Sequence, residues 1–89
     1  MLVERRIRSA ATNLLDSRPA GATICPSEIA QALADGAAPN AAGQNWRYAM
    51  PMVHSVIDQM VVEGLVRLSW KGVYLSARSG PYRISKAPA

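Results

Sequence analysis

The sequence predicts an α+β fold in which three helices precede a basic β-hairpin. Apolar residues recur at helical spacing up to residue 63 and alternate with polar residues after it. Charge follows the same division, because residues 65–89 hold five of the ten basic side chains and no carboxylate. With 89 residues, 49% of them hydrophobic, the chain is predicted to form one domain over residues 1–89.

The first predicted helix spans residues 1–16. Its apolar positions follow the spacing of one buried helix face, and arginines occupy the opposite face. The helix ends before residues 18–21, which include the two helix breakers Pro19 and Gly21. The apolar positions are Val3, Ile7, Ala10, Ala11, Leu14 and Leu15.

Residues 22–24 are predicted to form a short strand because they include two β-branched side chains. A second helix is predicted over residues 26–34, since Pro26 suits the first helical position and Glu28 can cap the helix start. Residues 35–45 form a loop far longer than the turn of about three or four residues in a tight helix-turn-helix motif.

The third predicted helix spans residues 46–63, with Asn45 as its cap and Gly64 as its end. Pro51 interrupts this helix because proline removes a backbone donor and disfavours α geometry in the residue before it. We expect one turn before Pro51 and then a kink or a restart. The apolar stripe comprises Trp46, Met50, Val53, Ile57, Met60 and Val61.

Residues 65–77 are predicted to form a hairpin around a two-residue turn at Lys71 and Gly72. A shift of one residue would mix apolar and polar side chains on each face, so the pattern specifies the register. This register assigns Trp70 to the core. The apolar partners that it places on one face are Trp70 with Val73, Leu68 with Leu75, and Val66 with Ala77.

The terminal extended segment, residues 81–85, is predicted to return Tyr82 and Ile84 to the core while Arg83 points outward. Three helices, a short strand before the second helix and a C-terminal hairpin make the outline of a winged-helix domain. In that outline, the hairpin is the wing. We therefore expect a winged-helix fold.

Several segments occur together and in one order over about residues 1–85. They are residues 25–33, residues 46–53, Glu63-Gly64, Lys71-Gly72 and residues 80–84. In this the chain resembles a family of small bacterial proteins known as domain of unknown function three-two-five-three. The resemblance implies a winged helix and carries no activity. An arginine tends to follow the valine of the third helix in that family, whereas this chain has His54 there.

The sequence argues against an enzyme, a metal site or a cofactor. Cys25 lies at a helix start, where a thiol pKa falls, but the one histidine, His54, is predicted on another helix. One cysteine and one histidine cannot supply the four ligands of structural zinc. The carboxylates form no pair with general acid/base spacing, and the glycines match no phosphate-binding loop.

The composition favours a cytoplasmic protein without membrane association. A single cysteine forms no internal disulfide and fits a reducing compartment. No apolar run approaches the ~20 residues that span a bilayer. The N-terminal residues mix charged and apolar side chains at helical spacing, unlike a signal peptide.

Aromatic side chains can stack on nucleic-acid bases when they are exposed. Trp46 and Trp70 lie on apolar stripes, so we expect both in the core. Tyr74 lies on the polar face of the hairpin close to Arg67 and Lys71, and we expect it to be exposed.

The basic C-terminal segment favours DNA binding with weak or modest sequence specificity. Groove-reading helices usually present basic and amide side chains to base edges, but the third helix also presents Asp58 and Glu63. We therefore expect DNA contact mainly through the wing and through Arg5, Arg6 and Arg8 of the first helix. The residues expected to contact DNA are Arg67, Lys71, Arg83, Arg78, Arg47, His54, Gln59, Arg5 and Arg8.

The alternative function is a protein-interaction module with a protein partner, or a homodimer. In that case the alanine-rich loop and the edge of the wing would form the contact surface. The basic side chains would then serve only to keep a sheet edge from aggregating. Salt distinguishes the two functions, because phosphate binding weakens steeply with salt and an apolar interface does not.

Overall fold

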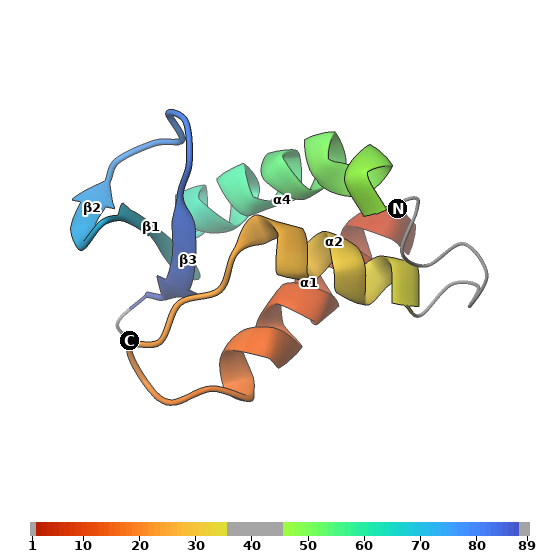
Figure 1. Cartoon of the computed structure of the whole chain (residues 1–89), viewed down its shortest axis with the longest axis horizontal. Coiled ribbons are helices and arrows are strands. Elements are labelled where there is room, and N and C mark those ends of the chain that lie inside the picture. The colour runs from red at the N-terminus through yellow and green to blue at the C-terminus, as the bar shows by residue number, and fades with distance from the viewer. Residues whose placement is uncertain (1, 36–45, 88–89) are drawn as a thin grey trace.

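The computed structural model describes residues 2–35 and 46–87 (Figure 1). Within these residues the fold is α+β, with three α-helices followed by a small three-stranded antiparallel sheet, consistent with a winged helix. The helices are α1 (Leu2–Asp16), α2 (Pro26–Asp35) and α4 (Met50–Val62), and the 3₁₀ turn η1 (Trp46–Ala49) precedes α4. The strands are β1 (Val66–Trp70), β2 (Val73–Leu75) and β3 (Arg83–Lys86).

Helices α2 and α4 each have a proline in their first turn, as the sequence predicted. Pro26 is the first residue of α2, and Oε2 of Glu28 accepts a hydrogen bond of 2.7 Å from the backbone N–H of Cys25. Pro51 lies in the first turn of α4, where its missing N–H interrupts no intrahelical bond. The predicted restart is therefore confirmed. The predicted cap, Asn45, and nearly all of the predicted loop lie outside the described residues.

The predicted hairpin register is confirmed as far as β2 extends. Lys71 and Gly72 form the turn with φ of 52° and 82°, the positive values that a two-residue type I′ turn requires. The expected pair of Val66 with Ala77 is wrong, because β2 ends at Leu75. After Leu75 the chain stops pairing with β1 and crosses toward the other edge of the sheet. The observed pairs are Leu68 with Leu75, Ser69 with Tyr74, and Trp70 with Val73.

Strand β3 connects the end of the chain to the middle of the fold. The sheet order is β2-β1-β3, and Ile84 lies opposite Leu68 of β1. On its other side, the backbone N–H and C=O of Ile84 both bond Ile24 at 2.8 Å. The strand predicted at residues 22–24 is reduced to this one bridge, because α2 begins two residues later at Pro26.

The core lies between the three helices and the inner face of the sheet (Figure 1). Tyr82 and Ile84 are buried there as predicted, and Trp46 packs against the core while partly exposed. Burial of each large aliphatic side chain contributes about 1.5–3 kcal/mol. The buried apolar residues are Ile7, Ala11, Leu15, Ile24, Ile29, Ala30, Val53, Val56, Ile57, Met60, Val66, Leu68, Tyr82 and Ile84.

Trp70 is not in the core, and the expectation that placed it there is wrong. Its side chain is 38% exposed, and that of its partner Val73 is 64% exposed, whereas Leu68, two residues earlier, is 1% exposed. Register determines which face of a strand a residue occupies, but not how far the covering helices extend. The hairpin projects past the helices, so its tip leaves the apolar face open (Figure 1).

Replacement of Ile84 and of Trp70 by alanine tests this boundary of the core. Ile84→Ala should cost about 2–5 kcal/mol, because it opens a cavity between three backbone segments. Trp70→Ala should cost less than about 1.5 kcal/mol despite removing the larger side chain. Urea unfolding followed by circular dichroism measures both values. Equal losses in the two variants would show that the hairpin tip belongs to the core.

Candidate nucleic-acid interface

Asp58 of α4 and Glu63, the C-cap of α4, are each held by an arginine from another part of the fold. Nε and Nη2 of Arg78 donate to the carboxylate of Asp58 at 2.8 and 2.9 Å. Nη1 and Nη2 of Arg8 donate to Glu63 at 2.7 and 2.8 Å, and this bonding lowers the pKa of Glu63. The charge of both acids is therefore neutralised locally, and both arginines are already engaged.

The same pairing extends to every carboxylate whose side chain the structure describes. Of the ten basic residues, four are in ion pairs, and six have no carboxylate partner among the described side chains. The remaining pairs are Arg18 with Glu28 at 2.6 Å, Lys86 with Asp16 at 2.6 Å, and Arg8 with Glu4 at 3.5 Å. The six residues are Arg5, Arg6, Arg47, Arg67, Lys71 and Arg83.

Two of these six arginines project from the outer face of the sheet. Arg67 lies opposite Ser85, and Arg83 lies opposite Ser69, so the pairs alternate with those that face the core. The guanidinium carbon of Arg67 lies 3.7 Å from the centre of the Tyr74 ring, and Tyr74 is 63% exposed, as predicted. This cation–π contact holds the arginine over the sheet without neutralising its charge.

Arg83 and Lys71 complete the charge on this part of the molecule. Nε of Arg83 donates to Oγ1 of Thr23 at 2.9 Å, and Nη2 donates to the Thr23 carbonyl at 3.2 Å. Lys71 is exposed at the tip of the hairpin. We call Arg67, Lys71 and Arg83 the basic sheet face.

Lys71 occupies a backbone conformation that lysine rarely adopts. Its φ of 52° lies in the left-handed region, and it is the one non-glycine residue with positive φ in the described part of the chain. Asparagine or glycine suits this turn position better, because lysine pays a steric cost there. The turn geometry therefore does not explain why a lysine occupies this position. The remaining explanation is the positive charge of its side chain.

His54 is bonded to a core residue and is not free to read bases. Its Nδ1 lies 2.6 Å from the hydroxyl oxygen of Tyr82, and the two groups form a hydrogen bond. Burial, with Arg78 as a second cause, lowers the pKa of His54, and burial raises the pKa of Tyr82 to about 12. Sequence reasoning assigned His54 to the helix surface and did not find its partner, 28 residues away.

The rest of α4 and the turn before it offers few groups for base reading. Gln59 is exposed, but its side-chain oxygen accepts a hydrogen bond of 3.2 Å from Arg8. Val62 is 87% exposed. The guanidinium of Arg47 lies 4.6 Å from the centre of the Trp46 ring in η1. This helix surface is nearly neutral, unlike the basic sheet face.

The predicted contact residues therefore do not form one surface. The basic sheet face lies at one end of the molecule, and the start of α1, which carries Arg5, lies at the opposite end (Figure 1). Arg6 is beside Arg5 near the start of α1, so it also lies away from the basic sheet face. Arg8 and Arg78 are engaged in their ion pairs with Glu63 and Asp58.

No helix in the described ranges is long and apolar enough to cross a membrane. Over the same ranges, no group of three or more histidine, cysteine or carboxylate side chains is placed to hold a metal ion. Cys25 is half-buried, and its Sγ lies 3.3 Å from the hydroxyl of Ser27.

Comparison with known proteins identifies a family and no curated relative. The sequence matches the family described as "Protein of unknown function (DUF3253)" over residues 4–87, which is almost the whole chain. No curated protein matches the sequence.

The burial of His54 and Tyr82 should make stability depend on pH at both ends of the range. Because the folded-state pKa of His54 lies below 6.5, the neutral-ring contribution is complete above that pH and declines as the pH falls below it. Because the pKa of Tyr82 is raised from 10.0 to about 12, its contribution is complete below pH 10 and declines as the pH rises toward 12.

Urea unfolding at a series of pH values measures both effects. His54→Gln should reduce the decline just below pH 6.5, and Tyr82→Phe should reduce the decline above pH 10. Equal pH profiles for the wild type and both variants would show that these groups titrate alike in the folded and unfolded chains.

Proposed function

The chain belongs to the DUF3253 family, whose function is unknown, and we propose that this member binds duplex DNA through its basic sheet face. The proposed binding has weak sequence preference. The protein acts in the cytoplasm as a binding domain rather than as an enzyme, and it needs no cofactor or metal.

The imbalance of charge supports this proposal most strongly. The described acids are paired with basic residues, while Arg67, Lys71 and Arg83 are left without a carboxylate partner at one end of the molecule. Positive side chains that can each displace a counterion from DNA supply the sequence-independent part of binding. An uncompensated cluster of this kind therefore suits a phosphate backbone.

The chemistry of α4 supports weak sequence preference. Base recognition in the major groove needs donors and acceptors that are free to reach base edges. His54 is bonded to Tyr82, Gln59 accepts from Arg8, and Asp58 is paired with Arg78. A helix with its polar groups engaged in this way contributes little direct readout.

A second candidate function, binding to another protein, is favoured by a different observation. The exposed large hydrophobic residues include Tyr48, Met52 and Val62, which lie in η1 and α4. Apolar side chains in exposed positions are typical of contact surfaces when they are contiguous. This candidate predicts binding that changes little with salt, in contrast to the DNA proposal.

Lys71→Asn separates binding from stability at the tip of the wing. Asparagine tolerates a positive φ, so the variant should gain about 0.5–1 kcal/mol in free energy of unfolding. The loss of one cation should weaken duplex binding, and the slope of log affinity against log salt should fall by about 0.9. Fluorescence anisotropy with a labelled duplex at several salt concentrations measures both binding values.

Arg5→Gln is the matched control, because it removes one exposed positive charge at the other end of the molecule. It should leave the salt slope close to that of the wild type. The proposal fails if Lys71→Asn binds like the wild type, or if both variants lose affinity equally. Absence of duplex binding by the wild type at low salt would favour the protein-binding candidate.

A further inference from the structure

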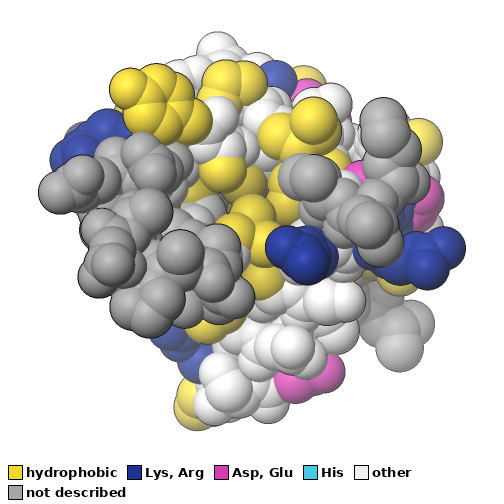
Figure 2. Space-filling model, turned by 90° about the vertical axis from the view of Figure 1, so that its right-hand side faces the viewer, with side chains coloured by type: hydrophobic (Ala, Val, Ile, Leu, Met, Phe, Trp, Pro, Cys, Tyr) yellow, Lys and Arg dark blue, Asp and Glu magenta, His cyan; other side chains and the backbone are white. Residues whose placement is uncertain are grey.

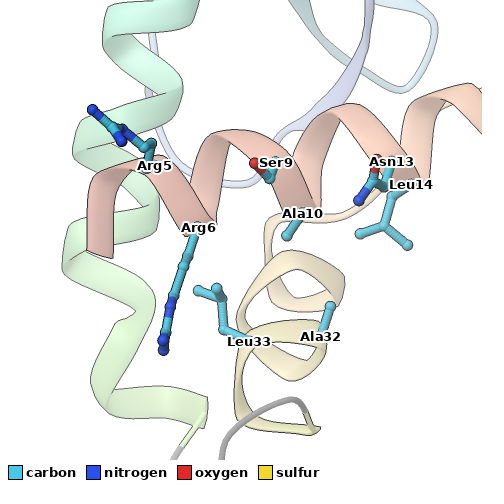
Figure 3. A pocket seen from close by; sticks show the side chains of 8 residues that line it. All are labelled: Arg5, Arg6, Ser9, Ala10, Asn13, Leu14, Ala32 and Leu33. Carbon is cyan, nitrogen blue, oxygen red and sulfur yellow. The ribbon is translucent and has the colours of Figure 1, made fainter. Parts of the chain in front are cut away.

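A groove lies between α1 and α2 (Figure 3), and its two arginines are near the start of α1, at the end of the molecule opposite to the sheet (Figure 1). Its volume is about 710 Å³. Ala10 and Leu14 of α1 and Leu33 of α2 supply apolar side chains to it, and Arg6 extends alongside Leu33 (Figure 3). Figure 2 shows this end of the molecule, where hydrophobic side chains gather in a hollow with basic side chains around them.

The two arginines of the groove are not explained by the fold. Arg5 and Arg6 are exposed, and neither is in an ion pair with a described carboxylate. Both lie near the start of α1, where the helix dipole is positive and basic side chains are unfavourable. An anionic ligand would offset this local concentration of positive charge.

We propose that this groove docks a short acidic amphipathic helix of a partner protein. Ser9, Ala10 and Ala32 are small, so they let a second helix approach closely, while Leu14 and Leu33 supply apolar contact. Along α1, the stretch from Arg6 to Leu14 is about 12 Å long, which matches roughly two turns of a docked helix. Carboxylates at one end of that helix would meet Arg5 and Arg6.

Charge argues against a second copy of this chain as the occupant. Among the side chains that the structure describes, the carboxylates are already engaged in ion pairs, so a second copy brings no free acid to the arginines. Nucleic acid would satisfy the arginines but would leave the apolar side chains without contacts. A helix with acidic and apolar residues satisfies both parts of the groove.

This docking site is independent of the proposed DNA contact. The start of α1, which carries Arg5 and Arg6, and the sheet lie at opposite ends of the molecule (Figure 1), whose longest dimension is 37 Å. A partner helix on α1 and α2 would therefore leave the wing accessible. Each end can be tested with a variant that leaves the other intact.

Three synthetic peptides added to the full, isotope-labelled chain test the proposal by NMR. The first is a helical peptide with leucines on one face and glutamates at one end. The second replaces its glutamates by lysines, and the third has the first composition in a scrambled order. The first peptide should bind saturably and shift the amide signals of Ala10, Leu14 and Leu33, while the other two should bind at least about fivefold more weakly.

Two variants at exposed positions identify the groove without disturbing the core. Arg6→Gln should weaken the acidic peptide up to about fivefold, as expected for an exposed ion pair. Ser9→Glu should weaken it further, because a new carboxylate repels the peptide and pairs with the arginines. Lys71→Gln, the control at the wing, should leave peptide affinity unchanged.

Several results would overturn the proposal. One is that none of the peptides binds saturably with a Kd below about 1 mM. Another is that the lysine peptide binds as tightly as the acidic peptide. A third is that the shifted amide signals all belong to elements other than α1 and α2. Dodecanoate serves as a separate arm. If it binds the groove and the acidic peptide does not, the site accepts a small anionic amphiphile instead of a helix.

Discussion

The backbone pairing of Ile84 is the constraint on which the rest of the structure depends. This residue bonds Ile24 on one side and lies opposite Leu68 on the other, so it joins the end of the chain to the entry of α2 and to the central strand. Its side chain is completely buried. Because β3 must occupy this position on the other side of β1, the chain has to leave the sheet after β2 and return along the opposite edge of β1, and this connection lies next to the hairpin that forms the wing.

The ion pairs determine where charge is neutralised on this fold. Arg78 links the wing to α4, Arg8 links α1 to α4, and Lys86 links β3 to Asp16 at the end of α1. Exposed pairs of this kind contribute little to stability, because solvent screens them. Their larger consequence is that they neutralise the described negative charges, leaving uncompensated positive charge on the basic sheet face and at the start of α1.

Local patterns predicted the parts of the fold that depend on neighbouring residues. The alternation around Lys71 and Gly72 specified the hairpin register, and Pro51 indicated where the third helix restarts. The exposure of Trp70 could not be predicted, because it depends on how far the helices extend over the sheet. The strand predicted at residues 22–24 became the single bridge of Ile24 with Ile84, because α2 begins two residues later at Pro26.

The candidate site was less accessible to sequence reasoning. Composition located the basic segment, but it did not reveal that Arg78 and Arg8 are paired or that His54 bonds Tyr82. Those contacts join residues that are 20, 55 and 28 positions apart. The positive φ of Lys71 likewise emerged only with the turn geometry.

The central claim is that the uncompensated basic residues of the wing contact DNA. Amide chemical-shift mapping with an unlabelled duplex tests this claim most directly. Binding at low salt should shift the amides of Arg67, Lys71, Tyr74 and Arg83, and the shifts should fade together as salt is added. The amides around Arg5 and Arg6 should move little. Shifts centred on α4 that persist at high salt would contradict the claim and point to readout by the helix.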